Sequence, residues 1–152
     1  MSKKYANPPY DRSDLTAVVQ STISELQRMG IYVKKSNEIH EYLLQFPDIM
    51  EATKRISKAS RQRFPGAQLS LEIYRDPEIE DEYLVLYIRF REYDEPIRKR
   101  LLQGIEDIEA AHEQYLVGKQ GWLLVTTDFQ PAEGVGWNEF QLARISFVGC
   151  AC

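Results

Sequence analysis

Cysteine and histidine are scarce in this sequence, and their scarcity limits the chemistry that the chain can carry. The two cysteines, Cys150 and Cys152, lie at the end of the 152 residues, so no pair is available to cross-link the body of the fold. This usage suits a reducing compartment, and we predict a cytoplasmic protein. Glu109 and His112 have the spacing found in di-iron helical bundles, but His40 has no acidic residue three positions before it. We therefore predict no metal site and no cofactor.

The sequence also lacks an excess of positive charge. It carries 23 acidic and 19 basic side chains, for a formal net charge of -4. Nucleic-acid binders gain much of their affinity from clustered lysines and arginines, so this balance disfavours a nucleic-acid partner without excluding it. The first ten residues, MSKKYANPPY, are basic but have no apolar core, so they match neither a signal peptide nor a membrane-spanning segment. We expect no membrane partner.

The common catalytic motifs are missing as well. The sequence has no G-x-S-x-G motif, no phosphate-binding loop and no convincing Ser-His-Asp or Cys-His set, and Gly134-Val135-Gly136 lacks the third glycine of a dinucleotide fingerprint. We therefore predict no catalytic residues, and we favour a non-enzymatic function over an enzymatic one.

The chain does contain enough apolar and aromatic residues for one packed domain. Hydrophobic residues make up 43% of it and 17 residues are aromatic, which is typical of a globular domain and not of a disordered segment. We expect a single domain over residues 1–152, with residues 1–11 as a mobile leader and 132–152 as an extension or tail.

Apolar residues at three- and four-residue spacing predict three helices in the first part of the chain. Each helix is followed by a glycine or a proline, and both residue types commonly end helices. The predicted helices cover residues 13–29, 36–46 and 48–64, and they end before Gly30, Pro47 and Pro65.

Two apolar runs separated by an acidic segment predict a β-hairpin from Leu69 to Phe90. In the first strand, Leu69, Leu71 and Ile73 alternate with polar residues, which is the pattern of a strand with one wet face. We therefore expect this strand to be at an edge or half-exposed. The second strand, residues 83–91, has one apolar and one semi-polar face, and we expect it to be central.

A long helix and another strand follow the hairpin. Asp94-Glu95-Pro96 is a typical helix start, and the apolar stripe after it continues to Gly118. Residues 122–129 predict a buried strand, and 140–148 predict a weak strand or an ordered tail. A strand, a helix and a second strand form a plausible parallel crossover. The predicted fold class is α+β or α/β, with three helices, a hairpin, a long helix and a strand (ααα-ββ-α-β).

The tip of the hairpin is the first candidate functional feature, because it gathers five acidic residues within seven positions. Clustered carboxylates attract a shared metal ion or a basic partner. The spacing is not that of an EF-hand loop, and a solvated turn with no function is the simplest alternative. If the tip binds, we expect a basic protein surface rather than a metal ion. The predicted partner-binding residues are Asp76, Glu78, Glu80, Asp81 and Glu82.

The second candidate is a face of the hairpin that combines aromatic and cationic residues. Such a face can stack the bases and hold the phosphates of single-stranded RNA. Glu72 on the same face and the missing ribonucleoprotein motif disfavour this function, and coverage by the N-terminal helices would rule it out. Asp128, just after the last strand, is a candidate base or ligand group. The RNA-binding residues of this alternative are Tyr74, Tyr83, Tyr87, Arg89 and Arg91.

Three segments between residues 61 and 131 carry a resemblance to known proteins: RQRFPGAQLSLEIYRDPEIEDEYLVLYIR, YDEPI and GKQGWLLVTTDFQP. Together they resemble a family of small uncharacterised bacterial proteins, over about half of the chain. The resemblance supports the predicted fold and implies no activity and no catalytic residue. Some small acidic proteins of this kind resemble components of toxin–antitoxin or defence gene pairs.

Three functional hypotheses result. The favoured one is a non-enzymatic protein–protein interaction module, antitoxin-like or an accessory subunit, whose acidic tip attracts a basic partner and whose edge strand accepts a strand of that partner. The second is an RNA-interacting module or a small nucleic-acid enzyme that uses the Tyr and Arg face. The third is a metal-dependent enzyme that uses Glu109, His112 and the acidic tip. A homo-oligomer is compatible with each of them.

Overall fold

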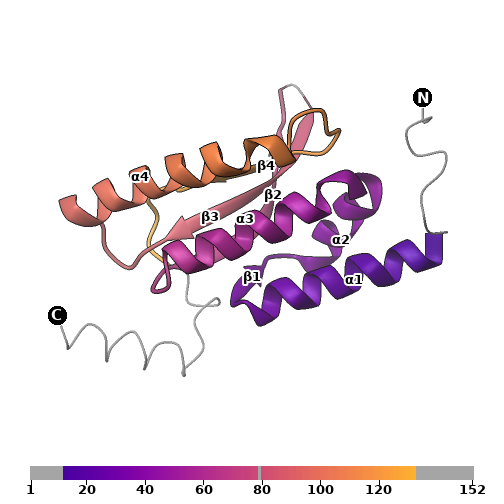
Figure 1. The fold of residues 1–152 in the computed structure, drawn as a ribbon, viewed down its shortest axis with the longest axis horizontal. Helices are drawn as coiled ribbons and strands as arrows, with labels where there is room; N and C mark the ends of the chain where they lie inside the picture. The colour runs from indigo at the N-terminus through magenta and orange to yellow at the C-terminus, as the bar shows by residue number, and fades with distance from the viewer. Residues whose placement is uncertain (1–11, 79, 133–152) are drawn as a thin grey trace.

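The computed structural model describes residues 12–78 and 80–132 (Figure 1). These residues form a mixed α+β fold, in which helices cover one face of a single sheet, and this confirms the predicted fold class. The predictions for residues 1–11, for the tail after Ala132, for the strand at 140–148 and for Cys150 and Cys152 lie outside the described residues.

The helices lie where the apolar spacing predicts them. The first one is followed by a turn at Gly30, which has a φ of 88° and donates its N–H to the Gln27 carbonyl at 2.9 Å. This left-handed conformation favours glycine, as expected of a helix C-terminus. The first three helices are α1 (Arg12–Arg28), α2 (Ser36–Gln45) and α3 (Met50–Arg63), and the short 3₁₀ helix η2 (Pro47–Ile49) precedes α3.

The long helix α4 (Glu95–His112) also begins as predicted. The side chain of Asp94 accepts a hydrogen bond from the N–H of Ile97 at 2.9 Å, and a proline lies in the first turn. The helix does not continue to Gly118. After His112 the hydrogen bonding tightens into the 3₁₀ helix η3 (Glu113–Tyr115).

Four strands in the described part of the chain form one sheet in the order β1-β2-β3-β4. β2 and β3 are the predicted antiparallel hairpin. In the sequence β3 precedes α4 and β4 follows it, and the two strands pair in parallel, which confirms the predicted crossover. β1 and β2 are also parallel. The strands are β1 (Ile31–Val33), β2 (Gln68–Asp76), β3 (Asp81–Arg89) and β4 (Leu123–Thr126).

The position of β2 corrects one prediction. The first hairpin strand was expected at an edge of the sheet or half-exposed. The edge position is wrong, because β2 lies between β1 and β3, and among the described strands the edges are β1 and β4. The half-exposed character is confirmed, since the strand is buried at residues 68–71 and exposed at Tyr74 and Arg75. The alternation of Leu69 and Leu71 reports that the two faces of β2 differ, and it contains no information on how many neighbours the strand has. The neighbour that was missed, β1, has only three residues, too few to show a period of two.

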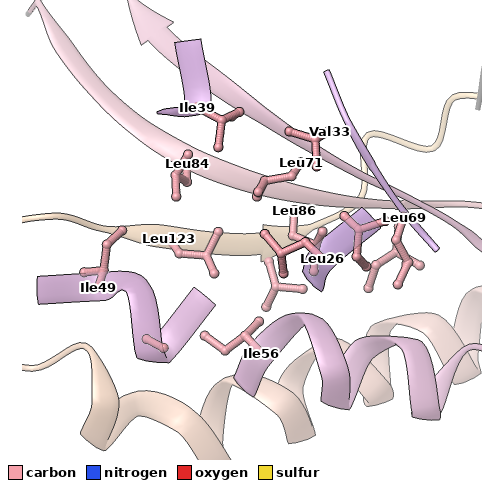
Figure 2. Close-up of a cluster of buried hydrophobic side chains, with 14 of the residues drawn as sticks. Leu26, Val33, Ile39, Ile49, Ile56, Leu69, Leu71, Leu84, Leu86 and Leu123 are labelled. Carbon is pink, nitrogen blue, oxygen red and sulfur yellow. The ribbon is translucent and has the colours of Figure 1, made fainter. Parts of the chain in front are cut away.

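The hydrophobic core lies between the sheet and the helices. Leu69 and Leu71 of β2, Leu86 of β3 and Leu123 of β4 are at most 2% exposed and share one face of the sheet. In Figure 2, Leu86 and Leu123 point from their strands toward Ile56 of α3, which is also buried. Helices α3 and α4 pack side by side over this face, and α1 packs beside β1 (Figure 1).

A close approach between α3 and α4 gives the first testable prediction. A Cβ atom at Gly104 would lie 2.3 Å from Cζ of Phe64, a core residue that is 6% exposed. In an isolated helix, Gly→Ala is favourable by about 1 kcal/mol. Here we expect Gly104→Ala to lower the free energy of unfolding by about 1 to 3 kcal/mol, because Phe64 must move within a packed core.

Urea unfolding of the purified variants measures this effect. Gly66→Ala is the matched control, because a Cβ at Gly66 would meet no atom within 4 Å. We expect it to change the stability by less than about 0.5 kcal/mol. A Gly104→Ala protein more stable than wild type would contradict the prediction, since it would mean that the core yields to the added methyl group without cost.

Candidate functional site

The second face of the sheet carries residues that the core does not use. Strand alternation places Tyr74, Tyr83, Tyr87 and Arg89 on this face, and the described helices lie on the other one (Figure 1). The N-terminal helices therefore do not cover it. We call it the tyrosine face. From the hairpin tip onward its rows are Asp76 and Asp81; Tyr74 and Tyr83; Glu72, Val85 and Leu124; Ser70, Tyr87 and Thr126; and Gln68 and Arg89.

Arg89 lies at one end of the tyrosine face in a cluster of charged side chains. Its Nε and Nη2 donate to the two carboxylate oxygens of Asp128 at 3.1 and 2.8 Å, and its Nη1 donates to Oε2 of Glu72 at 3.1 Å. Ser70 donates its hydroxyl to the same Glu72 oxygen at 2.9 Å. The guanidinium carbon lies 4.6 Å from the centre of the Tyr87 ring. Arg89 is only 4% exposed, so its charge is matched inside the protein.

The cluster shifts the pKa values of Arg89, Asp128 and Tyr87. Burial alone would lower the pKa of Arg89, but its hydrogen bonds with Asp128 and Glu72 outweigh burial and raise that pKa. The hydrogen bonds from Arg89 hold the pKa of Asp128 below its ordinary value, against the effect of desolvation. Burial, and then the nearby charges of Glu72 and Asp128, raise the pKa of Tyr87. Arg89 and Asp128 are therefore ionised and Tyr87 is neutral near neutral pH.

Three aromatic side chains form a row across the tyrosine face next to the hairpin tip. Tyr74 and Tyr83 pair directly across β2 and β3, and their ring centroids are 5.2 Å apart. Trp122 precedes β4, and its carbonyl accepts from the N–H of Leu84 at 3.0 Å, so the pairing of β3 and β4 extends to this residue. Its neighbours Gly121 and Leu123 face the core, so alternation places Trp122 on the tyrosine face, next in line to Tyr83. Tyr74 is 39% and Trp122 is 45% exposed. We call Tyr74, Tyr83 and Trp122 the aromatic row.

The hairpin tip, described for residues 76–78 and 80–82, contains hydrogen bonds of its own. Oδ1 of Asp76 accepts from the N–H of Glu78 at 3.0 Å, and the carbonyl of Asp76 accepts from the N–H of Glu80 at 2.9 Å. Asp81 and Glu82 then begin β3. Asp76 is half-buried and the other four acidic side chains are exposed, so all five carboxylates predicted at the tip are close to solvent.

Strand alternation divides these carboxylates between the two sides of the hairpin. Asp76 and Asp81 pair with each other and lie on the tyrosine face, and Glu82 pairs with Arg75 on the opposite side. Arg75 forms ion pairs with Glu82 at 2.8 Å and with Glu38 of α2 at 3.2 Å. These three side chains line a groove of about 390 Å³ between α2 and the hairpin, and further lining residues are Asn37, Glu41, Tyr42 and Ile73.

The loop before β4 is positioned by two side chains from distant parts of the sequence. The hydroxyl of Tyr42 accepts a hydrogen bond from the N–H of Trp122 at 3.1 Å. The carboxylate of Asp48 accepts from the N–H groups of Gln120 and Gly121 at 2.6 and 3.3 Å. Because these partners are 72 to 80 residues apart, no local pattern indicates them. They explain why the sequence did not predict Trp122 as part of the aromatic row.

Other predicted candidates do not come together into a site. Glu109 is exposed on α4, and Nδ1 of His112 lies 2.8 Å from the carbonyl oxygen of Ile108 on the same helix. Arg91 is exposed beyond the end of β3. Within residues 12–78 and 80–132, no three His, Cys, Asp or Glu side chains are close enough to hold a metal ion.

Comparisons with known proteins give no match: no family model fits the chain, and the searches of curated proteins and of solved structures found nothing similar. None of the described helices combines the length and the apolar character needed to cross a bilayer. Functional inference therefore depends on the geometry of the tyrosine face and the hairpin tip.

Proposed function

We propose that this protein is a non-enzymatic interaction module whose hairpin tip binds a protein partner with a basic surface, as an antitoxin-like or accessory subunit. The observation that carries the proposal is the division of the tip carboxylates between both sides of one hairpin, with Asp76 and Asp81 on one side and Glu82 on the other. Carboxylates on both sides give the tip a negative potential that attracts a basic partner from either direction.

The tip is also prepared for binding. Hydrogen bonds within the turn and the ion pairs of Arg75 with Glu38 and Glu82 restrict its described residues, which lowers the conformational entropy lost on docking. Arg75 is the only basic residue among those that line the described groove beside the tip, and its charge is already matched by two carboxylates. The surface offered to a partner is therefore negative.

Addition of a partner strand to β2 was part of the favoured hypothesis from the sequence. It assumed that the first hairpin strand has a free edge along its length, but β1 occupies that edge from Leu69 to Leu71. We therefore propose docking through side chains of the tip rather than through a backbone ladder on β2.

RNA binding has less support from the site. Its physical basis is the aromatic row, which could stack bases. However, Arg89 is buried between Glu72 and Asp128, so it is not presented to a phosphate, and the carboxylates of Asp76 and Asp81 adjoin the aromatic rings. The charges beside the row repel a polyanion and attract a cation.

A triple variant that neutralises the tip tests the proposal. We expect Glu78→Gln, Glu80→Gln and Asp81→Asn together to weaken binding roughly tenfold, since three exposed charges contribute about 0.5 kcal/mol each. The immobilised protein is exposed to native lysate at low and at moderate salt, the stoichiometric partner is identified, and its affinity for both proteins is measured with purified components.

The matched control is Glu106→Gln, Glu109→Gln and Glu113→Gln, which removes the same charge from exposed positions on α4 and η3. We expect it to bind like wild type. The proposal fails if no stoichiometric partner is retained at low salt, or if the tip variant and the α4 variant bind the partner equally well.

A further inference from the structure

We infer that the aromatic row and the two carboxylates beside it bind an arginine side chain of the partner. In this arrangement Tyr74, Tyr83 and Trp122 offer their ring faces to a guanidinium group, and Asp76 and Asp81 accept its hydrogen bonds. The inference rests on the proposed function and specifies the chemistry that the partner presents.

The positions of the five residues support one continuous site. Asp76 and Asp81 form the row of the tyrosine face that directly follows the row of Tyr74 and Tyr83, so carboxylates and rings adjoin on the same side of the hairpin. Burial raises the pKa of Tyr83 most, followed by Tyr74 and then by the charges of Asp81 and Asp76, in keeping with this arrangement. No described lysine or arginine forms an ion pair with Asp76 or Asp81.

The same face already contains this arrangement with an arginine of its own. Arg89 lies 4.6 Å from the centre of the Tyr87 ring and is held by the carboxylates of Asp128 and Glu72 at 2.8 and 3.1 Å. The aromatic row with Asp76 and Asp81 repeats the combination of ring and paired carboxylates nearer the tip. In this second case Tyr74 is 39% and Trp122 is 45% exposed, and Tyr83 between them is half-buried, so the cation comes from outside.

Arginine fits the site better than lysine does. A guanidinium group is planar, so it can stack on an aromatic ring while its edge donates hydrogen bonds to a carboxylate. An ammonium group is more strongly hydrated and offers no flat surface for stacking. A phosphate group or an acidic peptide would meet the two carboxylates and be repelled.

An NMR titration of the full chain tests the inference with two capped peptides, Gly-Gly-Arg-Gly-Gly and Gly-Gly-Lys-Gly-Gly. We expect the arginine peptide to shift the indole N–H resonance of Trp122, assigned with Trp122→Phe, and the amide resonances of Tyr74 and Tyr83. We expect the lysine peptide to bind more weakly. Tyr74→Ala and Trp122→Leu should each weaken binding of the arginine peptide roughly three- to fivefold, the effect expected for the loss of one exposed cation–π contact.

Leu102→Ala is the matched control, because Leu102 is a large exposed hydrophobic side chain (52%) on α4, away from the tyrosine face. The inference is overturned if both peptides bind equally, if Tyr74→Ala and Trp122→Leu bind like Leu102→Ala, or if a single-stranded oligouridine shifts the same resonances more strongly than the arginine peptide does. The proposed function is tested separately, since in each of these cases the tip variant can still lose the partner while the α4 variant retains it.

Discussion

Replacing Arg89 with alanine is expected to lower the free energy of unfolding by about 3 kcal/mol, the lower end of the range for breaking a buried ion pair. Arg89 is 4% exposed and donates to Asp128 at 2.8 and 3.1 Å and to Glu72 at 3.1 Å. Without the guanidinium, two carboxylates face each other in a partly buried place with no cation between them. We expect a loss at the lower end of that energy range because the side chain of Asp128 is 33% exposed, so water can solvate its carboxylate.

Urea unfolding at neutral pH measures this loss, and Arg75→Ala is the matched control. Arg75 also forms ion pairs with two carboxylates, Glu38 and Glu82, but its side chain is 53% exposed. Exposed ion pairs contribute little, so we expect Arg75→Ala to cost less than about 1 kcal/mol. Equal losses for the two variants would contradict the idea that burial decides the contribution of Arg89.

The pH dependence of the difference between wild type and Arg89→Ala provides a second check. The pKa of Asp128 is depressed in the folded protein, chiefly by its hydrogen bonds with Arg89. Its contribution to stability is therefore present above the ordinary Asp pKa of about 4 and is lost as the pH falls through the folded value. We expect the difference in stability between wild type and Arg89→Ala to shrink as the pH is lowered below about 4. A constant difference would mean that Arg89 acts through packing alone.

Replacing Arg61 with alanine is expected to lower the free energy of unfolding by about 2 to 4 kcal/mol, because hydrogen bonds from a charged donor contribute about 1.5 to 3 kcal/mol each and are not additive. Arg61 of α3 donates to the carbonyls of Met29 and Gly30 at the end of α1, at 3.2 and 2.9 Å. It also donates to the carbonyl of Ala67 at 2.9 Å and, at 3.3 Å, to those of Phe64 and Pro65. One side chain thus joins the ends of two helices and the loop before β2.

Two further variants isolate the cause of this effect in urea unfolding. Arg61→Lys keeps the charge but cannot reach carbonyls on both helices at once. We therefore expect its free energy of unfolding to be lowered almost as much as that of Arg61→Ala. Arg63→Ala removes a neighbouring arginine whose side chain is 41% exposed and bound to Asp107 at 2.9 Å, and we expect a loss below about 1 kcal/mol. An Arg61→Lys protein as stable as wild type would show that charge alone, and not the fork of donors, supports the junction.

The local elements of this fold could be predicted from the sequence because their signals are local. The stripe that ends at Gly30 predicts α1, and Asp94 with a proline just inside predicts the start of α4. The alternation of Leu69, Leu71 and Ile73 predicts β2. Each signal repeats within a few residues, so a short window is sufficient to read it.

The neighbours of these elements could not be predicted in the same way. Ile31 pairs with Leu69 across 38 positions of sequence, and this pairing makes β2 a central strand. The three residues of β1 are too few to mark a strand by themselves. Strand order follows from which apolar faces the whole chain can bury together, and that choice involves all the elements at once.

For the candidate site, the sequence by itself determined the acidic tip and the sharing of one face by Tyr74 and Tyr83, because alternation along a strand is a local geometric rule. Only the tertiary structure decided that Arg89 is neutralised by Asp128, that Asp76 and Asp81 pair on the tyrosine face, and that the backbone of Trp122 pairs with β3 at Leu84. The reason is physical: side-chain direction along a strand depends on adjacent residues, whereas the partners of a charge or a ring depend on which distant segments the core brings together.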